Sequence, residues 1–172
     1  AQPTQTAARN WMLRRLLVES IRQDPAYANG NYREQPPSLR LAGTFFATAT
    51  NGGTLALQTA APTRAAADAL VEARLGAGVT ADANDFVYQW DSSRDYDPSP
   101  RLGGIRARVL AINAADDERN PPETGVMQAA MQRVPQGRLL LIPAGEATSG
   151  HGTTGNALLW REALREFLRR PE

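Results

Sequence analysis

Two kinds of side chain near the end of the chain have the chemistry needed for acid–base catalysis. His151 is the only histidine, and it lies among small residues in the segment Gly150-His-Gly152. Imidazole is the one side chain whose ordinary pKa lies near neutral pH, so this position suits a general base. Upstream of it stand two adjacent acids, Asp116 and Asp117. The alternative interpretation is a surface histidine without a role, together with an aspartate pair that caps a helix beginning near Pro121.

Both segments follow short apolar runs that predict buried strands. Residues 107–113 and 138–142 are rich in Val, Leu and Ile, and helical patterns follow at about 122–133 and 155–169. This alternation of strand and helix predicts a βαβα unit with a parallel pair of strands. Catalytic groups of open α/β sheets gather beyond the carboxyl ends of the strands. The acids and the histidine are therefore expected at the same edge.

The first hundred residues carry little strand signal. Their apolar spacing predicts four helices, over residues 9–22, 38–50, 63–75 and 81–92. A segment rich in Pro and Gly follows at 96–104, so we place a boundary near residue 100. Residues 1–100 then form an all-α region and residues 101–172 an α/β region. A free-standing helical bundle is the alternative interpretation of the first part.

The two polar segments resemble the last two strand–loop units of the α/β-hydrolases, a fold in which the triad occurs in the chain order Ser, Asp, His. In that family the acid commonly lies four residues before a proline, as Asp117 lies before Pro121. The resemblance therefore implies that Asp117 is the acid and His151 the base. Asp116 remains the alternative acid.

Further motifs narrow the resemblance to the homoserine O-acetyltransferases and related α/β-fold hydrolases. They are Asn10-Trp-Met-Leu-Arg-Arg15, Asp24-Pro25, Gly30-Asn-Tyr32, Arg94-Asp-Tyr-Asp-Pro-Ser-Pro100, Asn120-Pro-Pro-Glu123 and Gly150-His-Gly152. The similarity covers nearly the whole chain. It implies an α/β fold that is a C-terminal fragment of an α/β-hydrolase: a helical cap over residues 1–100, then a βαβα unit of the parallel sheet. Aromatic residues of the cap either line a substrate pocket or form the cap's own core.

A nucleophile elbow, G-x-S-x-G, is absent from the sequence. None of the six serines has glycine both two residues before and two residues after it, and the chain has no cysteine to act instead. The resemblance thus implies part of a serine acyl-ester enzyme, a hydrolase or an O-acetyltransferase. In it the nucleophile and oxyanion hole come from a missing N-terminal segment or a second chain. The alternative is a non-catalytic remnant or interaction module.

The composition of the chain limits which partners and cofactors are expected. Hydrophobic residues make up 42% and charged residues 22% of the chain, and the net charge is +1, so we expect neither a nucleic-acid nor a membrane partner. A single histidine and no cysteine argue against a metal site. We expect a small ester or acyl substrate, no cofactor except acetyl-CoA as donor in a transferase, and a homodimer as one possible assembly. No signal peptide is visible, and the compartment is left open with the cytoplasm favoured.

Overall fold

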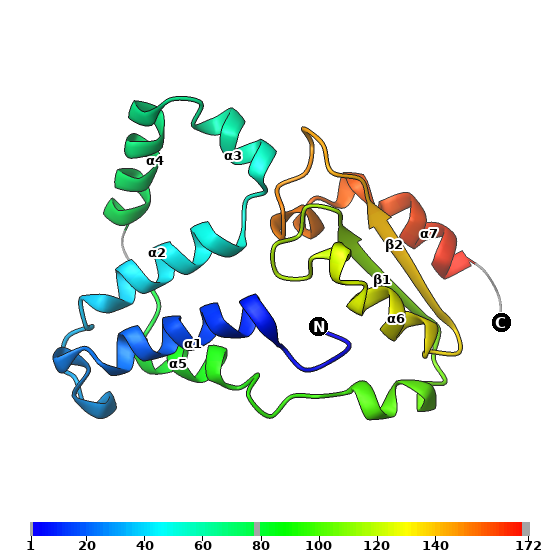
Figure 1. Cartoon of the computed structure of the whole chain (residues 1–172), viewed down its shortest axis with the longest axis horizontal. Helices are drawn as coiled ribbons and strands as arrows, with labels where there is room; N and C mark the ends of the chain where they lie inside the picture. Colours follow the sequence, from blue (N-terminus) through cyan, green and yellow to red (C-terminus); the bar gives the residue numbers. More distant parts are fainter. Residues whose placement is uncertain (1, 78–79, 170–172) are drawn as a thin grey trace. The chain divides into compact units, whose positions relative to one another are not determined.

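The computed structural model describes residues 2–77 and 80–169. The chain divides into two compact units (Figure 1). The sheet unit contains residues 1–5, 50–59 and 97–172, and the helical unit contains residues 6–49 and 60–96. Residues 50–59 thus pack with the sheet, although they lie within the sequence range of the predicted helical cap. The boundary near residue 100, between a helical cap and an α/β region, remains a prediction.

The helical unit contains the four helices predicted from the apolar spacing. They are α1 (Ala8–Arg22), α2 (Ser38–Thr50), α4 (Arg64–Gly76) and α5 (Ala83–Asp91), and a 3₁₀ segment, Pro25–Gly30, follows α1. All four predicted ranges are confirmed to within two residues at each end. Two of the beginnings have side-chain caps, because Thr63 accepts a hydrogen bond from an amide of α4 and Asp82 accepts two from α5.

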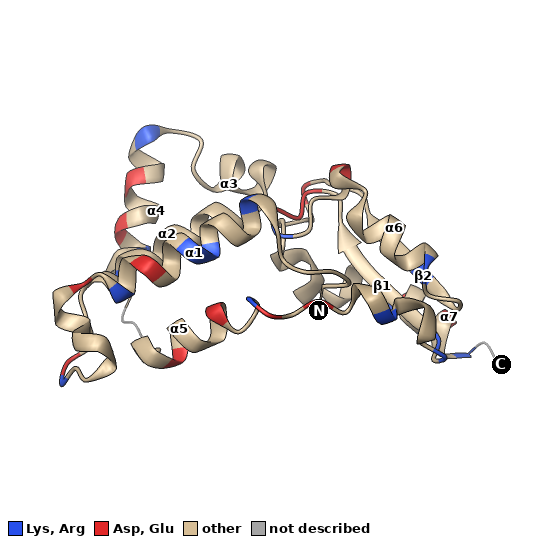
Figure 2. Cartoon of the chain, turned by 60° about the horizontal axis from the view of Figure 1, so that its bottom comes forward, with Lys and Arg blue, Asp and Glu red and all other residues tan. Residues whose placement is uncertain are grey.

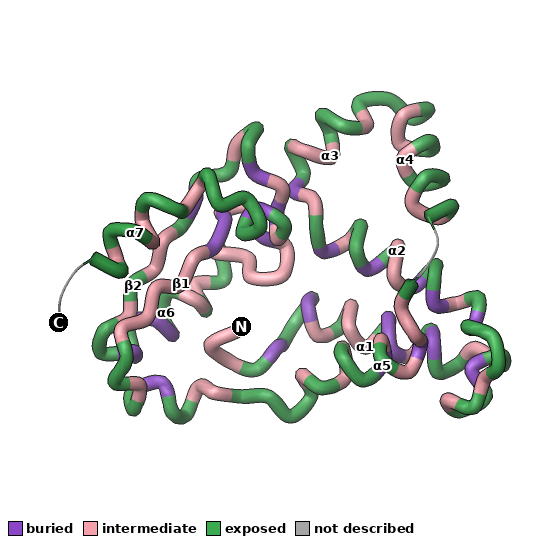
Figure 3. The backbone as a smooth tube through the Cα atoms, turned by 180° about the vertical axis from the view of Figure 1, so that it is seen from behind, coloured by how far each residue is buried: buried purple, intermediate pink, exposed green. Residues whose placement is uncertain are grey.

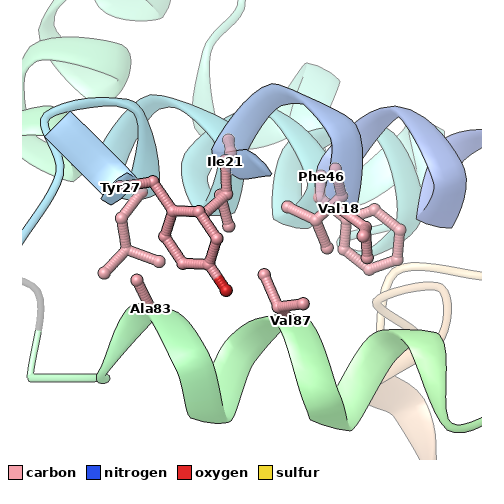
Figure 4. Close-up of a cluster of buried hydrophobic side chains, with 9 residues drawn as sticks. Val18, Ile21, Tyr27, Phe46, Ala83 and Val87 are labelled. Carbon is pink, nitrogen blue, oxygen red and sulfur yellow. The ribbon is translucent and has the colours of Figure 1, made fainter. Parts of the chain in front are cut away.

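The core of the helical unit is formed where α1, α2 and α5 meet (Figure 4). Its buried side chains are Leu17, Val18, Ile21, Tyr27, Leu39, Ala42, Phe46, Ala83 and Val87. They recur at helical spacing, so each helix buries one stripe. Tyr27 is therefore part of the core, whereas Tyr88 is 70% exposed. Met12 and Leu16, on the neighbouring face of α1, are also exposed.

The sheet unit is built on two parallel strands, β1 (Val109–Ala114) and β2 (Gly137–Ile142). Their register pairs Val109 with Gly137 and Ala114 with Ile142, so both strands end at the same level. Helix α6 (Val126–Gln132) connects them, which confirms the predicted parallel pair. A small core is formed by Leu102, Val134 and two residues of α6, Ala130 and Met131. Figure 3 shows buried segments in both units.

The helices of the structure differ from the predicted ones in three places. A short helix, α3 (Thr54–Ala60), was not predicted. The helix predicted over 122–133 is divided, because Gly125 has a φ of +66° between the 3₁₀ turn Pro122–Thr124 and α6. Of the range 155–169, which was predicted as one helix, only Arg161–Arg169 is α-helical, as α7. Ahead of it the chain forms the 3₁₀ turns Gly152–Gly155 and Ala157–Leu159, the second capped by Asn156.

Figure 2 shows both basic and acidic residues in the helical unit and in the sheet unit. This agrees with the net charge of +1. Within the described residues, no helix has both the length and the apolar character needed to cross a bilayer.

Candidate active site

The acid loop follows directly from the end of β1. Its first turn is closed by a hydrogen bond from the Asp117 amide to the Ala114 carbonyl, 3.2 Å long. Asp117 is only 2% exposed. Its carboxylate accepts hydrogen bonds from the amides of Arg119 (2.7 Å) and Asn120 (2.9 Å). The buried amide of Asn113 donates to the Asn120 carbonyl at 2.8 Å and holds the far side of the loop. The carboxylate is thus fixed by main-chain donors.

The histidine loop follows β2 and is equally constrained. Gly150 has a φ of +58°, a conformation that glycine adopts without strain, and it turns the chain into the 3₁₀ segment Gly152–Gly155. The hydroxyl of Thr153, which is completely buried, accepts a hydrogen bond from the Ser149 amide at 2.8 Å. His151 lies between Gly150 and Thr153, where the chain enters the 3₁₀ turn.

The structure brings the two predicted residues together. His151 Nδ1 lies 3.0 Å from Asp117 Oδ2 and 3.1 Å from Oδ1. An ionised carboxylate only accepts hydrogen bonds, so Nδ1 carries the proton and Nε2 has a free lone pair. Nε2 has no hydrogen-bond partner within the described part of the chain. The histidine side chain is 33% exposed and the aspartate side chain 1%, so the imidazole is accessible while its partner is buried.

The environment keeps Asp117 ionised. Burial acts to raise the pKa of its carboxyl group, but the hydrogen bond from His151 and those from the amides of Asn120 and Arg119 outweigh burial. The net result is a pKa below the ordinary value of an aspartate. A negative charge beside Nδ1 is what an imidazole needs in order to accept a second proton at Nε2.

Asp116, the alternative acid, is directed elsewhere. Its Oδ2 accepts hydrogen bonds from the Thr148 hydroxyl at 2.8 Å and from the Gly150 amide at 3.1 Å. Both partners belong to the histidine loop, but neither is the imidazole. Asp116 therefore holds the loop, and Asp117 is the carboxylate at the ring.

A third segment, which the sequence pattern did not connect to the site, also contacts it. The turn after α2 is bonded to both loops: the Gly53 amide donates to Glu118 Oε1 at 2.7 Å, and the Gly52 amide donates to the Ser149 carbonyl at 3.2 Å. The guanidinium of Arg119 donates to the hydroxyl of Thr50 at 3.1 Å. The glycine pair at 52–53 identifies a turn in the sequence, but no local pattern indicates which loop the turn contacts.

No cluster of three or more potential metal ligands occurs among residues 2–77 and 80–169. The described groups form a buried carboxylate next to an oriented imidazole, in a loop held by hydrogen bonds. Such a pair can take a proton from a hydroxyl placed at Nε2 and later return it.

Several solved structures have a fold similar to that of this chain. No protein-family model matches the sequence, and no curated protein matches it significantly. Among solved structures, it is similar to homoserine O-acetyltransferase from Bacillus anthracis, with a TM-score of 0.80, 20% identity and coverage of 97% of this chain and 51% of that one. Esterase E22 follows with a TM-score of 0.76, 20% identity and coverage of 96% and 52%. An acetylester hydrolase from Corynebacterium glutamicum has a TM-score of 0.65, 14% identity and coverage of 95% and 50%.

The chain spans about half the length of each of these structures. At such low identity the likeness shows the fold alone. The predicted fold is confirmed: the chain has an α/β-hydrolase fold and fits a C-terminal portion of it, with a helical region and two parallel strands of the sheet.

Proposed function

We propose that this chain supplies the acid and base of a Ser-Asp-His triad in an enzyme that transfers or hydrolyses an acyl ester. Asp117 is the acid, His151 the base, and the serine lies outside the chain. The observation that carries the proposal is the hydrogen bond between His151 Nδ1 and the buried carboxylate of Asp117, beyond the ends of two parallel strands. This is the place where α/β sheets hold catalytic groups.

The chemistry follows from the two ring nitrogens. As the serine oxygen attacks the ester carbonyl, Nε2 of His151 accepts the hydroxyl proton, and the carboxylate of Asp117 stabilises the resulting imidazolium. The imidazolium then returns that proton to the leaving alcohol or thiol, and an acyl-enzyme remains. Water or an acceptor alcohol attacks this acyl group, again losing its proton to Nε2, and the serine is released.

Two features support a nucleophile outside the chain. No serine of this sequence stands in a G-x-S-x-G elbow. In addition, β1 pairs only with β2 among the described strands, so its second edge has no partner there. Parallel sheets are normally larger and covered on both faces, and a pair of strands is marginal alone. Further strands from an additional segment or a second chain would complete the sheet and bring the elbow.

The proposal covers both a hydrolase and a homoserine acetyltransferase-like transferase. Water and an alcohol differ little at the acyl carbon, so the pocket and its exclusion of water select between them. Acetyl-CoA is the donor in the transferase case, and otherwise no cofactor is required. A homodimer is compatible with either reaction.

The test uses the natural polypeptide that contains this sequence, together with a fluorophosphonate reagent that labels activated serines. We expect stoichiometric labelling of a serine in a G-x-S-x-G peptide outside these 172 residues, and loss of labelling in His151→Ala. The 172-residue chain by itself should show no burst with an activated acetate ester. A burst from this chain that His151→Ala abolishes would show that the nucleophile is inside it. A natural polypeptide without a labelled serine would overturn the proposal and favour the alternative of a non-catalytic interaction module.

A further inference from the structure

Three consecutive acidic residues each hold a different part of the histidine loop. Asp116 accepts from Thr148 and Gly150, and Asp117 accepts from the imidazole of His151. Glu118 accepts from the main chain: its Oε2 lies 3.0 Å from the His151 amide nitrogen. The third contact acts on the histidine itself but not on its ring, so it has a separate role.

We propose that Glu118 is a positioning residue for His151. Its carboxylate joins the main chain of the histidine to the turn at residues 51–53 and so fixes where the base lies. This inference rests on the proposed function, because positioning has catalytic meaning only if His151 is the base.

Glu118 uses both carboxylate oxygens as a bridge between two distant amides. Oε1 accepts from the Gly53 amide at 2.7 Å and Oε2 from the His151 amide at 3.0 Å. These partners lie 65 and 33 residues away in the sequence. One half-buried side chain therefore connects three segments of the sheet unit. Amide donors to an ionised carboxylate form the stronger class of hydrogen bond.

Glycines at positions 53 and 150 allow this close approach. A Cβ at Gly150 would overlap the carboxylate of Glu118, and Gly150 also has a φ of +58°. A Cβ at Gly53 would lie 2.7 Å from both Asp116 Oδ2 and the Gly150 amide nitrogen. Only glycine at both positions lets the turn, the histidine loop and the acids pack this closely. The bridge is thus part of the packing of the site.

Asp117 and Glu118 control different parts of His151. Asp117 holds Nδ1 and sets the rotation of the ring, while Glu118 holds the amide and sets the position of the backbone. Without Glu118 the His151 amide loses its acceptor, and only the flanking residues stay held, by Asp116 and by Thr153. A small backbone shift at His151 would then let the ring keep its bond to Asp117 while Nε2 moved away from its target. A displacement of about 1 Å can cost about a hundredfold in rate.

The test begins with amide hydrogen exchange, followed by NMR, of the unmodified natural polypeptide that contains this sequence. We expect the amides of His151 and Gly53 to exchange at least tenfold more slowly than the amide of Glu146, an exposed residue of the same loop. In Glu118→Gln, the side-chain NH₂ replaces one acceptor and faces an amide donor. Exchange at one or both amides should then accelerate at least tenfold, whereas the matched control Glu146→Gln should leave both unchanged. Unprotected amides at His151 and Gly53 in the unmodified natural polypeptide, or unchanged exchange in Glu118→Gln, would overturn the bridge.

The catalytic part is measured in the intact enzyme. Glu118→Gln should lower kcat at least tenfold with KM nearly unchanged, because the base is displaced while the substrate pocket is not altered. An active enzyme with the same kcat in Glu118→Gln overturns the positioning role and leaves the proposed function intact. Altered exchange in a protein that has no acyl-ester activity in any form would retain the bridge but remove the proposed function, and with it the catalytic role of Glu118.

Discussion

Replacing Asp117 with asparagine should reverse the tautomer of His151. Asparagine has nearly the shape of aspartate, and its oxygen can still accept from the amides of Arg119 and Asn120, at 2.7 and 2.9 Å in the unmodified chain. Its NH₂ group then faces Nδ1 of the imidazole. Because an NH₂ group only donates, Nδ1 becomes the acceptor and the proton moves to Nε2. The nitrogen proposed as the base loses its lone pair.

The magnitude can be worked from the hydrogen bonds. A bond to a charged group contributes about 1.5–3 kcal/mol, and a neutral bond about 0.5–1.5 kcal/mol. The Nδ1–H tautomer is therefore favoured about ten- to a hundredfold by the carboxylate, since 1.4 kcal/mol is a factor of about ten. The two retained amide bonds each weaken by about 1 kcal/mol, so Asp117→Asn should also lower the free energy of unfolding by about 2 kcal/mol.

The lone histidine makes the assay unambiguous. Long-range ¹⁵N–¹H correlation of the imidazole identifies the protonated nitrogen, and every ring signal belongs to His151. We expect Nδ1–H in the unmodified chain, Nε2–H in Asp117→Asn, and no change in Asp116→Asn, whose carboxylate contacts Thr148 and Gly150. In the intact enzyme, Asp117→Asn should cost about 10⁴-fold in kcat and Asp116→Asn much less. Retention of Nδ1–H in Asp117→Asn, or the opposite ranking of activities, would refute the assignment of the acid.

Three further predictions concern stability. Gly150→Ala should lower the free energy of unfolding by at least about 1 kcal/mol, because φ is +58° and the added Cβ overlaps Glu118. In the urea titration that measures it, Gly145→Ala, which has no neighbour within 4 Å, should be neutral. Leu39→Ala, at a position 2% exposed, should destabilise the helical unit by about 2–5 kcal/mol, and Leu41→Ala, at 62% exposure, by less than about 0.5 kcal/mol. The lowered pKa of Asp117 stabilises the fold above the ordinary value of 3.8, and this contribution is lost as pH falls through the lower folded value. When the free energy of unfolding is measured against pH, the unmodified chain should remain more stable than Asp117→Asn until the pH falls below about 4. If the difference in stability disappears already at about pH 6, ionisation of Asp117 is not its cause.

Much of the site could be predicted because it depends on local patterns. The apolar runs at 107–113 and 138–142 identify two strands, and parallel strands bring the residues after them to one edge. The contact between Asp117 and His151 then follows from the position of each residue after its strand. The preference for Asp117 over Asp116 rests on the resemblance to a family in which the acid lies four residues before a proline, and no local physical signal distinguishes the two residues.

The remaining contacts could not be predicted, because they depend on backbone angles and on distant segments. Gly125 interrupts a convincing helical pattern through a positive φ that the sequence does not specify. Asn156 accepts from the Leu158 amide and starts a short 3₁₀ turn where the apolar spacing predicted a continuous helix. The bond from Gly53 to Glu118 joins residues 65 apart, and neither residue has a neighbour that indicates the pairing.

All the contacts that orient the imidazole lie within the sheet unit. The acid loop, the histidine loop and the turn at residues 50–53 belong to it, so the pairing of His151 with Asp117 does not depend on the helical unit. Variants in the core of the helical unit, such as Leu39→Ala, should therefore leave the tautomer of His151 unchanged. A change of tautomer in Leu39→Ala would mean that the dyad depends on contacts beyond its own unit.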